Sequence, residues 1–507
     1  MDPFFSDPAT MRTDPEPFEL AHPNSFYIGG QWTPPSGPGQ IVVTNSATEA
    51  HFLSVPEAQE ADMDAAVAAA RAAFDTGPWP RMTPHERAFY MRALADELDR
   101  RSDDLARVWT TESGVVHSAA RVTAKTLGDA YRFYAGLADT FPFIEQHVPK
   151  GGGHFGLLVR EPVGVAAAII PWNGPLRLMT YKLAPALMAG CAVILKASPE
   201  APSAPYIMAE VCHAAGLPPG VLNVLTADRQ VSEYLVRHPG VDKVSFTGST
   251  QAGKRIASAC AERIARVTLE LGGKSAAIVL DDYDLDLVAQ SLSKSATYLT
   301  GQACSSLTRV IVSRHRQAQL LEAMAHHFGQ IQVGDPFDAA TGMGPLATAK
   351  HRERVEGYMA RGCEGGAKLV TGGKRPAHAP RGYFVEPTVF GDVSNDAVIA
   401  REEIFGPVLS VIPVDSEQDA VRTANDSVYG LNASVFTHDA ERAYAVAREL
   451  RTGTVGHNAF RSDFSIAFGG FKQSGLGREG GVEGLLPYLE SKTLVLDELP
   501  AFLRPAR

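Results

Sequence analysis

The chain has 507 residues, of which 45% are hydrophobic and 21% are charged, and its formal net charge at pH 7 is −10. A chain of this length holds about two or three domains, and the composition is ordinary for a globular protein. The excess of acidic residues gives no electrostatic footprint for nucleic acid or for an anionic membrane surface. We therefore expect no nucleic acid and no membrane as partner, and chemistry on a small molecule instead.

The cysteines and the N-terminus indicate the compartment. Five cysteines are scattered over the chain, too few for a disulfide framework and without the CxxC spacing of a zinc site. Residues 1–20 contain acids and prolines where a signal peptide has a basic start and an apolar run, and no stretch reaches the roughly 20 apolar residues of a membrane span. We expect free thiols, no bound metal and a cytoplasmic location.

The N-terminal part of the chain is expected to be an arm followed by a covering helix. Residues 1–24 are rich in Pro and Asp without a hydrophobic period, which predicts a flexible arm, and folded structure is expected from about Phe26. The sequence Thr83-Pro84-His85-Glu86 has the form of a capping box. It predicts the start of a long amphipathic helix over residues 87–107.

From about residue 163 the sequence alternates between short apolar runs and helical segments. The first series comprises Val163–Ile170, Lys182–Ala189, Cys191–Lys196, Pro202–Ala214, Val221–Leu225 and Lys243–Phe246. A second series starts at Val267–Leu271 and Ala276–Leu280 and continues past Gly430. Such alternation is typical of parallel sheets with helices on both faces. The sequence thus predicts an α/β fold built from two sheets that share a cleft.

Three separate segments carry side chains suited to acyl chemistry on a thiol. Cys304 lies between a helix and the strand Thr308–Ser313, where a thiol can be partly exposed and react as thiolate. Glu270, at the end of a strand, can act as a general base, and the side-chain amide of Asn173 can donate to an oxyanion. Each also has an ordinary interpretation, as an inert small hydrophobe, a surface acid and a turn residue. Only their combination favours catalysis.

A longer series of motifs runs through the chain in a fixed order. It comprises Pro171-Trp172-Asn173, Lys182 in Tyr181-Lys182-Leu183-Ala184-Pro185, Lys196, Phe246-Thr247-Gly248-Ser249-Thr250, Glu270-Leu271-Gly272-Gly273-Lys274, Gly301-Gln302-Ala303-Cys304, Glu402-Glu403-Ile404-Phe405-Gly406-Pro407 and Phe468-Gly469-Gly470-Phe471-Lys472-Gln473-Ser474-Gly475. Their order and spacing resemble the aldehyde dehydrogenase superfamily over about Phe26 to Leu496. The resemblance implies a Rossmann-like cofactor-binding domain and an α/β catalytic domain that share a cleft, and NAD(P)-dependent oxidation of an aldehyde to a carboxylic acid.

The resemblance also implies one role for each catalytic candidate. Cys304 is the expected nucleophile, and its backbone N–H together with the Asn173 side chain is the expected oxyanion hole. Attack on the aldehyde gives a thiohemiacetal, which loses hydride to the nicotinamide and becomes a thioester. Glu270 is the expected base that activates the water for thioester hydrolysis.

The cofactor contacts follow from the same resemblance. No Gly-x-Gly-x-x-Gly fingerprint follows a strand; instead residues 248–253 join the strand Lys243–Phe246 to a helix, so that backbone N–H groups face a pyrophosphate. By resemblance, Ser249 contacts the pyrophosphate, Lys196 the adenosine ribose and Glu403 the nicotinamide ribose. The further cofactor-binding residues that the resemblance implies are Ile170, Trp172, Lys182, Gly248, Gly253, Leu271 and Phe405.

The sequence departs from the family pattern near the adenosine ribose. Many members carry Glu three residues after the ribose lysine, where this chain has Pro199, with Glu200 one position later. A Glu in that place repels the 2′-phosphate of NADP, and Arg229 in the following loop is a candidate partner for this phosphate or a solvated loop charge. The expected cofactor is NAD, with NADP as the alternative.

Two further departures concern the catalytic base and the substrate. Some relatives carry an additional glutamate at what looks like Val482 here, so Glu270 is expected to act without that helper unless Glu483 replaces it. Gly174 stands where many relatives have a bulky aromatic residue, which predicts a wider entrance to the site. The candidate lining residues are Arg177, Phe460, Arg461 and Phe464. An arginine there suits a semialdehyde or is a surface charge, and the phenylalanines favour an aromatic or terpenoid-like aldehyde.

The predicted domains are interleaved along the chain. Residues 25–137 and 160–268 form the dinucleotide-binding domain, and residues 269–480 form the catalytic domain. Residues 138–159 and 481–507 are the expected oligomerisation segments, in which residues 488–496 alternate like a strand and His154–Val159 is a candidate partner. In the family such segments form a β arm, and covering its edge favours a homodimer or homotetramer.

Two alternatives remain open at this point. A CoA-acylating semialdehyde dehydrogenase uses CoA to resolve the thioester, and Glu270 speaks against it because that branch needs no water-activating base. A catalytically silent binding protein is disfavoured by the presence of Cys304, Asn173 and Glu270 together.

Overall fold

The centre of the molecule is an eight-stranded sheet with strand order β19-β11-β10-β7-β8-β9-β1-β2. The computed structural model describes residues 18–503. The strands from β11 to β9 run parallel to one another, and antiparallel strands close both edges. The strand bounds are β1 Phe26–Ile28, β2 Gln31–Thr33, β7 Val165–Ile169, β8 Ala192–Ala197, β9 Leu222–Thr226, β10 Lys243–Thr247, β11 Arg266–Glu270 and β19 Gly475–Leu476.

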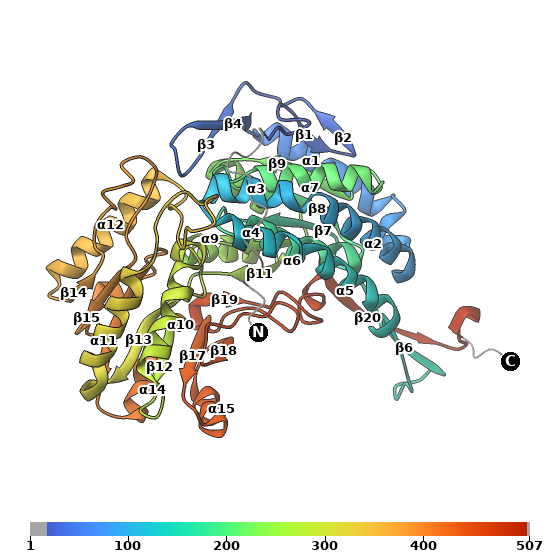
Figure 1. Cartoon of the computed structure of the whole chain (residues 1–507). Helices are drawn as coiled ribbons and strands as arrows, with labels where there is room; N and C mark the ends of the chain where they lie inside the picture. The colour runs from blue at the N-terminus through green and yellow to red at the C-terminus, as the bar shows by residue number, and fades with distance from the viewer. Residues whose placement is uncertain (1–17, 504–507) are drawn as a thin grey trace.

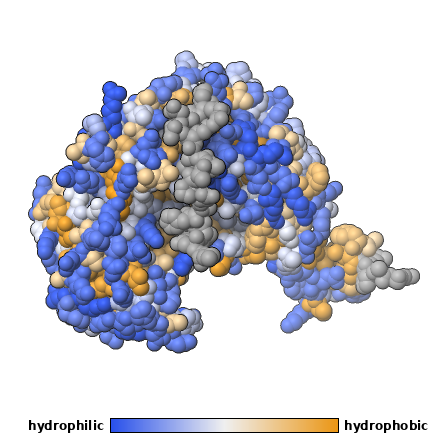
Figure 2. Space-filling view, in the orientation of Figure 1, coloured by the Kyte–Doolittle hydropathy of each residue, from blue (hydrophilic) through white to orange (hydrophobic). Residues whose placement is uncertain are grey.

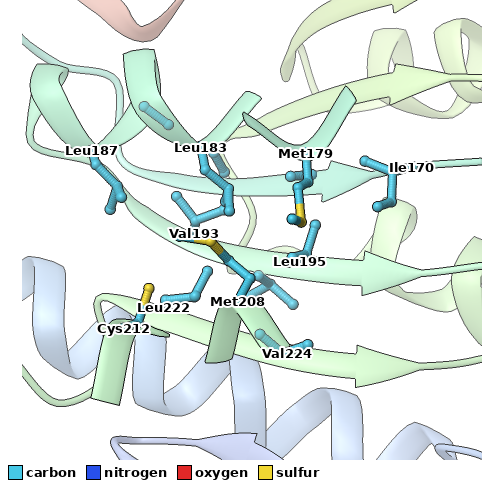
Figure 3. Close-up of a cluster of buried hydrophobic side chains, with 14 of the residues drawn as sticks. Ile170, Met179, Leu183, Leu187, Val193, Leu195, Met208, Cys212, Leu222 and Val224 are labelled. Atoms are coloured by element: carbon cyan, nitrogen blue, oxygen red, sulfur yellow. The ribbon is translucent and has the colours of Figure 1, made fainter. Parts of the chain in front are cut away.

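Helices cover this sheet, and the largest core lies between them and the strands (Figure 1). Apolar side chains of α6 and α7 pack against alternate residues of β8 and β9, among them Met179, Leu183, Val193 and Leu222 (Figure 3). Strands buried on both faces explain the nearly continuous apolar runs in the sequence. The helices are α1 Glu60–Asp75, α2 Pro84–Arg100, α3 Ser102–Ser113, α4 His117–Ala124, α5 Leu127–Thr140, α6 Pro175–Ala189, α7 Ser203–Ala214, α8 Arg229–Arg237 and α9 Thr250–Glu262.

A second, seven-stranded sheet has strand order β14-β15-β16-β13-β12-β17-β18 and is parallel apart from β14. Its strands are β12 Ser275–Val279, β13 Leu307–Ser313, β14 Lys368–Thr371, β15 Thr388–Gly391, β16 Val408–Val414, β17 Asn432–Phe436 and β18 Thr454–His457. Its helices are α10 Leu285–Thr297, α11 Arg314–Gly329, α12 Ala349–Glu364, α13 Val398–Arg401, α14 Glu417–Asn425 and α15 Ala440–Glu449. The predicted α/β fold with two sheets is confirmed.

A small three-stranded sheet projects from the body (Figure 1). It consists of β5 (Ile144–His147), β6 (Phe155–Pro162) and β20 (Leu489–Leu496) in the order β20-β6-β5. β20 pairs antiparallel with β6, with Leu496 opposite Phe155, which confirms the predicted pairing. The remaining strands, β3 Gln40–Thr44 and β4 His51–Pro56, form a hairpin near the N-terminus.

The predicted capping box is present, but the helix it opens is shorter than predicted. The Thr83 side chain accepts from the Glu86 N–H at 3.3 Å, and the Glu86 carboxylate accepts from the Thr83 N–H at 2.7 Å. The helix ends at Arg100, and a second helix, α3, begins at Ser102. The single predicted helix over residues 87–107 is therefore two helices.

Two other expectations are wrong. The segment Val267–Leu271 does not open the second series, because β11 pairs in parallel with β10 of the first sheet. Residues 18–24 of the predicted flexible arm lie on the body: Leu20 is buried in the first core, and the Ala21 N–H donates to Glu210 at 3.0 Å. Residues 1–17 lie outside the described part. Within residues 18–503, no helix is long and apolar enough to cross a membrane.

Candidate active site

The three predicted catalytic residues meet where the two sheets face each other. Asn173 follows β7, Glu270 is the last residue of β11, and Cys304 precedes β13. The Asn173 side-chain N–H donates to the carbonyl of Gln302 at 2.8 Å, two residues before the thiol. A Cβ on Gly273 would lie 2.3 Å from the Cys304 carbonyl oxygen, so only glycine allows the strand end that carries Glu270 to approach this loop.

The loop before Cys304 has an unusual backbone. Leu299 and Thr300 in η2 (Tyr298–Gly301) have φ angles of 51° and 56°, and Gly301 follows with φ 70°. Left-handed conformations cost bulky and β-branched residues of the order of 1–2 kcal/mol each. Gln302 offsets part of this cost, because its side chain donates to the carbonyls of Ser113 and Leu299 and accepts from the Ala347 N–H at 2.9 Å. The surrounding structure thus fixes the position of the thiol.

Helix α3 fixes the loop that carries Asn173. The Trp109 indole N–H donates to the Asn173 carbonyl at 3.0 Å, and the Ser113 hydroxyl donates to the Trp172 carbonyl at 2.7 Å. Asn173 is buried, and its amide points toward the Cys304 loop. A neutral donor held in this way can stabilise an oxyanion without reorganising during the reaction.

Glu270 is a buried carboxyl beside a buried ion pair. Within the described residues, neither of its carboxylate oxygens has a hydrogen-bond partner. Burial raises its pKa well above the usual range, the neighbouring Glu479 raises it further, and Lys182 and Arg478 oppose this shift. Lys182 on α6 is completely buried, forms an ion pair with Glu479, and lies 3.3 Å from the Ser245 hydroxyl.

These contacts correct two predictions. Glu270 does have an acidic neighbour, but it is Glu479 in Gly477-Arg478-Glu479, three residues before the exposed Val482. The structure also contradicts the prediction that Lys182 contacts the cofactor, because its ammonium is inaccessible and paired with Glu479. The only sign of Glu479 in the sequence was its place as the first acid after the last motif of the resemblance, four residues after Gly475.

The surroundings of Cys304 disfavour its thiolate form. The residue is partly exposed, but desolvation of the sulfur raises the thiol pKa far above its usual value, and the carboxylates of Glu403 and Glu270 raise it further. The backbone N–H groups of Cys304 and Ser305 donate to the sulfur and oppose this shift. These N–H groups therefore lie on the same side of the loop as the sulfur, beside the carbon that the sulfur would attack.

The carboxyl ends of the parallel strands form the predicted dinucleotide edge. β7 lies between β8 and β10, so the strand order reverses there, and ligands of α/β sheets bind at such a switch point. Ser249 is the N-cap of α9, and its hydroxyl accepts from the Ala252 N–H at 3.3 Å. A Cβ on Gly248 would lie 2.5 Å from the Phe246 ring, and one on Gly253 would lie 2.4 Å from Leu271. This close-packed helix start suits a pyrophosphate.

Glu403 and Phe405 face this edge from the second sheet. The Glu403 carboxylate accepts from the Gly273 N–H at 3.1 Å, and burial raises its pKa to about 7. Phe405 has φ 66°, and its ring meets the Trp172 indole edge-on at 5.6 Å. Ile170 and Lys196 are buried at the ends of β7 and β8. Apart from Lys182, the structure brings the predicted cofactor residues to one edge.

A cavity of about 380 Å³ lies between α5, α6 and the loop after residue 461. It is lined by Leu127, Ala130, Phe133, Arg177, Thr180, Tyr181, Asp463 and Phe464, among others. Tyr181 stacks on Phe464 with centroids 4.6 Å apart, and Phe464 stacks on Phe468 at 4.2 Å. Cys304 packs against the cluster that contains both phenylalanines.

Two of the predicted lining residues are therefore present in this cavity and two are not. Arg177 lies over the Phe464 ring at 5.8 Å. Phe460 packs instead near Tyr298, and Arg461 is exposed outside the lining. The ring stack from the cavity to the thiol involves Tyr181 and Phe468, which the sequence did not single out as lining residues.

Comparisons with known proteins agree with this site. The family model described as aldehyde dehydrogenase family matches residues 32–494. The chain is 46% identical to geranial dehydrogenase of Castellaniella defragrans, over 93% of this chain and 98% of that protein. It is 40% identical to 3-succinoylsemialdehyde-pyridine dehydrogenase of a Pseudomonas species, over 93% and 98% of the two chains.

Solved structures give the same result. A Mycobacterium tuberculosis aldehyde dehydrogenase complexed with NAD+ superposes with a TM-score of 0.90 at 42% identity, covering 93% of this chain and 98% of that one. The Pseudomonas syringae aldehyde dehydrogenase C mutant, complexed with NAD+ and octanal, has a TM-score of 0.90 at 40% identity, covering 96% and 99%. With a match over nearly its whole length and a thiol, an amide and a carboxyl meeting between the two sheets, this chain belongs to the aldehyde dehydrogenase family.

Proposed function

We propose that this protein oxidises an apolar aldehyde to the carboxylic acid with NAD+, through a thioester on Cys304. The observation that carries the proposal is the position of Cys304 between the dinucleotide edge of the first sheet and the aromatic cavity. Aldehyde and cofactor would then reach the same atom from opposite sides. The solved relatives named as NAD+ complexes support the choice of cofactor.

The residues of the chain divide the chemistry between them. The Cys304 thiol loses its proton to solvent, and the sulfur attacks the carbonyl carbon as thiolate. The carbonyl oxygen becomes an alkoxide that receives hydrogen bonds from the Asn173 amide and the Cys304 N–H. Bound NAD+ supplies the hydride acceptor that converts the thiohemiacetal to a thioester. Glu270, as carboxylate, then removes a proton from the water that attacks the thioester carbon, and the sulfur leaves.

The proposed cofactor contacts come from both sheets. Ser249 and the N-terminus of α9 hold the pyrophosphate, Lys196 donates to the adenosine ribose, and Glu403 accepts from the nicotinamide ribose. The residues that shape the groove around these contacts are Ile170, Trp172, Gly248, Gly253, Leu271 and Phe405.

The cavity favours a neutral, apolar aldehyde. The apolar part of its lining is formed by Leu127, Ala130, Phe133, Tyr181 and Phe464, beside polar and charged residues, and the stack of Tyr181, Phe464 and Phe468 continues this apolar surface toward the thiol. Arg177 is accompanied in the lining by Asp129 and Asp463, so the entrance carries no net positive charge for an anionic semialdehyde. Geranial, named for one relative, and octanal, named for another, are apolar aldehydes of this kind.

Steady-state kinetics test the proposal. NADH formation is measured with wild type and Cys304→Ala over aliphatic, aromatic, terpenoid and semialdehyde substrates, first without CoA. We expect turnover of apolar aldehydes by wild type alone. Turnover that starts only when CoA is added would replace this mechanism by the CoA-acylating one, and cofactor binding without any turnover would support a silent binding protein.

The projecting sheet supports a homo-oligomer. Val148, Val495 and Phe502 on or beside β5, β6 and β20 are 88%, 54% and 75% exposed, and hydrophobic residues are visible on this part of the surface (Figure 2). An open sheet edge with exposed apolar side chains is a surface for pairing with a second copy. Light scattering on the full chain and on Val495→Asp tests this: we expect a dimer or tetramer that the substitution weakens. A monomeric wild type would refute the oligomer. A cytoplasmic location stays a prediction, which the five free cysteines accommodate.

A further inference from the structure

The end of the dinucleotide edge beyond Lys196 is lined with carboxylates. Lys196 and Ala197 end β8, and they pair in parallel register with Leu225 and Thr226 at the end of β9. Glu200 follows β8, and Asp228 follows β9, so both acids leave the sheet beside the Lys196 ammonium. They are also the charges that raise the pKa of Lys196 against the larger lowering by burial, which brings it to about 8.

Two polar groups that could receive an extra phosphate here are already bonded to these acids. The Ser198 hydroxyl donates to the Glu200 carboxylate. Asp228 is the N-cap of α8, and its carboxylate accepts from the Val231 N–H at 3.1 Å. A helix N-terminus is an anion site, but this one holds the chain's own anion. Arg229 is exposed on the first turn of α8, directly after Asp228 in the chain.

We infer that Glu200 and Asp228 together make the site selective for NAD+ over NADP+. They take the place of the glutamate that many family members carry at the position of Pro199. The inference rests on the proposed function, because it takes Lys196 as the ligand of the adenosine ribose. A 2′-phosphate carries nearly two negative charges at neutral pH. Placed on that ribose, it would meet two carboxylates and would have to displace them from Ser198 and from the start of α8.

Binding of the two dinucleotides to the full-length protein tests the inference without turnover. Dissociation constants for NAD+ and NADP+ are measured by titration calorimetry for wild type and for Glu200→Gln/Asp228→Asn. Both substitutions keep size and hydrogen bonds, since Asn also caps helices. Glu233→Gln, an exposed acid farther along α8, is the matched control. We expect wild type to favour NAD+ by about 100-fold, the double variant to lower this ratio about tenfold or more, and the control to leave it unchanged.

The salt dependence of binding distinguishes charge repulsion from steric exclusion of the 2′-phosphate. Between about 0.05 and 0.5 M salt, screening should lower the preference for NAD+ over NADP+ in wild type and leave it nearly constant in the double variant. Equal affinity of wild type for the two dinucleotides, or an unchanged ratio in the double variant, would overturn the inference while leaving the proposed function intact. Loss of NADP+ affinity in Arg229→Ala would overturn it as well, because Arg229 would then be a ligand of the 2′-phosphate. Failure to bind either dinucleotide would refute the proposed function together with the inference.

Discussion

Replacing Glu479 by glutamine should shift the pH dependence of thioester hydrolysis to lower pH. Glu270 works as a base only when ionised, and Glu479 is the neighbouring charge that raises its pKa. At an effective dielectric constant of about 20, a neighbouring carboxylate of this kind contributes about 2 kcal/mol, or between one and two pKa units. Removing this charge lowers the pKa of Glu270, so the acid limb of the kcat profile should move down by about one unit.

The assay is kcat against pH with a saturating aldehyde, under conditions in which a pre-steady-state burst of NADH shows that hydrolysis limits turnover. Glu483→Gln is the matched control, since Glu483 is an exposed acid four residues further along the chain. Lys182 loses its partner in Glu479→Gln, and pairing with the ionised Glu270 would reinforce the downward shift. An acid limb that moves upward, or that moves no further than in the control, would refute the assignment of Glu479 as the charge that sets this pKa.

Three further predictions concern the nucleophile, the oxyanion hole and the cavity. Cys304→Ala should lose all turnover and keep its NAD+ affinity in calorimetry; residual oxidation would mean that another nucleophile serves. Asn173→Ala should lower kcat roughly 10²–10³-fold, as the loss of an oxyanion donor does, and a fall below tenfold would show that its amide merely anchors the Gln302 carbonyl. Phe464→Ala should raise KM for octanal about tenfold and leave KM for acetaldehyde nearly unchanged, because the lost ring contact lies in the cavity; equal effects on both would place the substrate elsewhere.

The sequence predicted which strands carry the catalytic residues better than it predicted which strands pair with one another. Asn173, Glu270 and Cys304 each follow or precede a recognisable strand, so their convergence could be expected. The partner of a strand is decided by long-range packing, and the short sequences of β11 and β12 do not indicate which sheet each strand joins. The sequence therefore predicted the wrong sheet for β11. The chain crosses from the first sheet to the second between β11 and β12, within a few residues that include Gly272 and Gly273.

Glu479 illustrates a second limit of the sequence. It lies 209 positions after Glu270, and an acid after Gly-Arg has the pattern of a solvated turn. Only the fold shows that β19, which precedes it, pairs with β11 and carries it under the end of that strand. The left-handed backbone of Leu299 and Thr300 was equally hidden, since neither residue type favours that conformation.

The charges of the site suggest why it can hold a thiol and a carboxyl in one desolvated space. Burial disfavours both anions, and Glu270 raises the pKa of the Cys304 thiol in addition. The two groups need not be ionised together, because formation of the thioester removes the charge from sulfur before Glu270 has to act. In the acyl-enzyme Glu479 is then the remaining acid that raises the pKa of Glu270, with Lys182 opposing it. In the proposed mechanism, the buried pair of Lys182 and Glu479 therefore acts on thioester hydrolysis, through its effect on the pKa of Glu270.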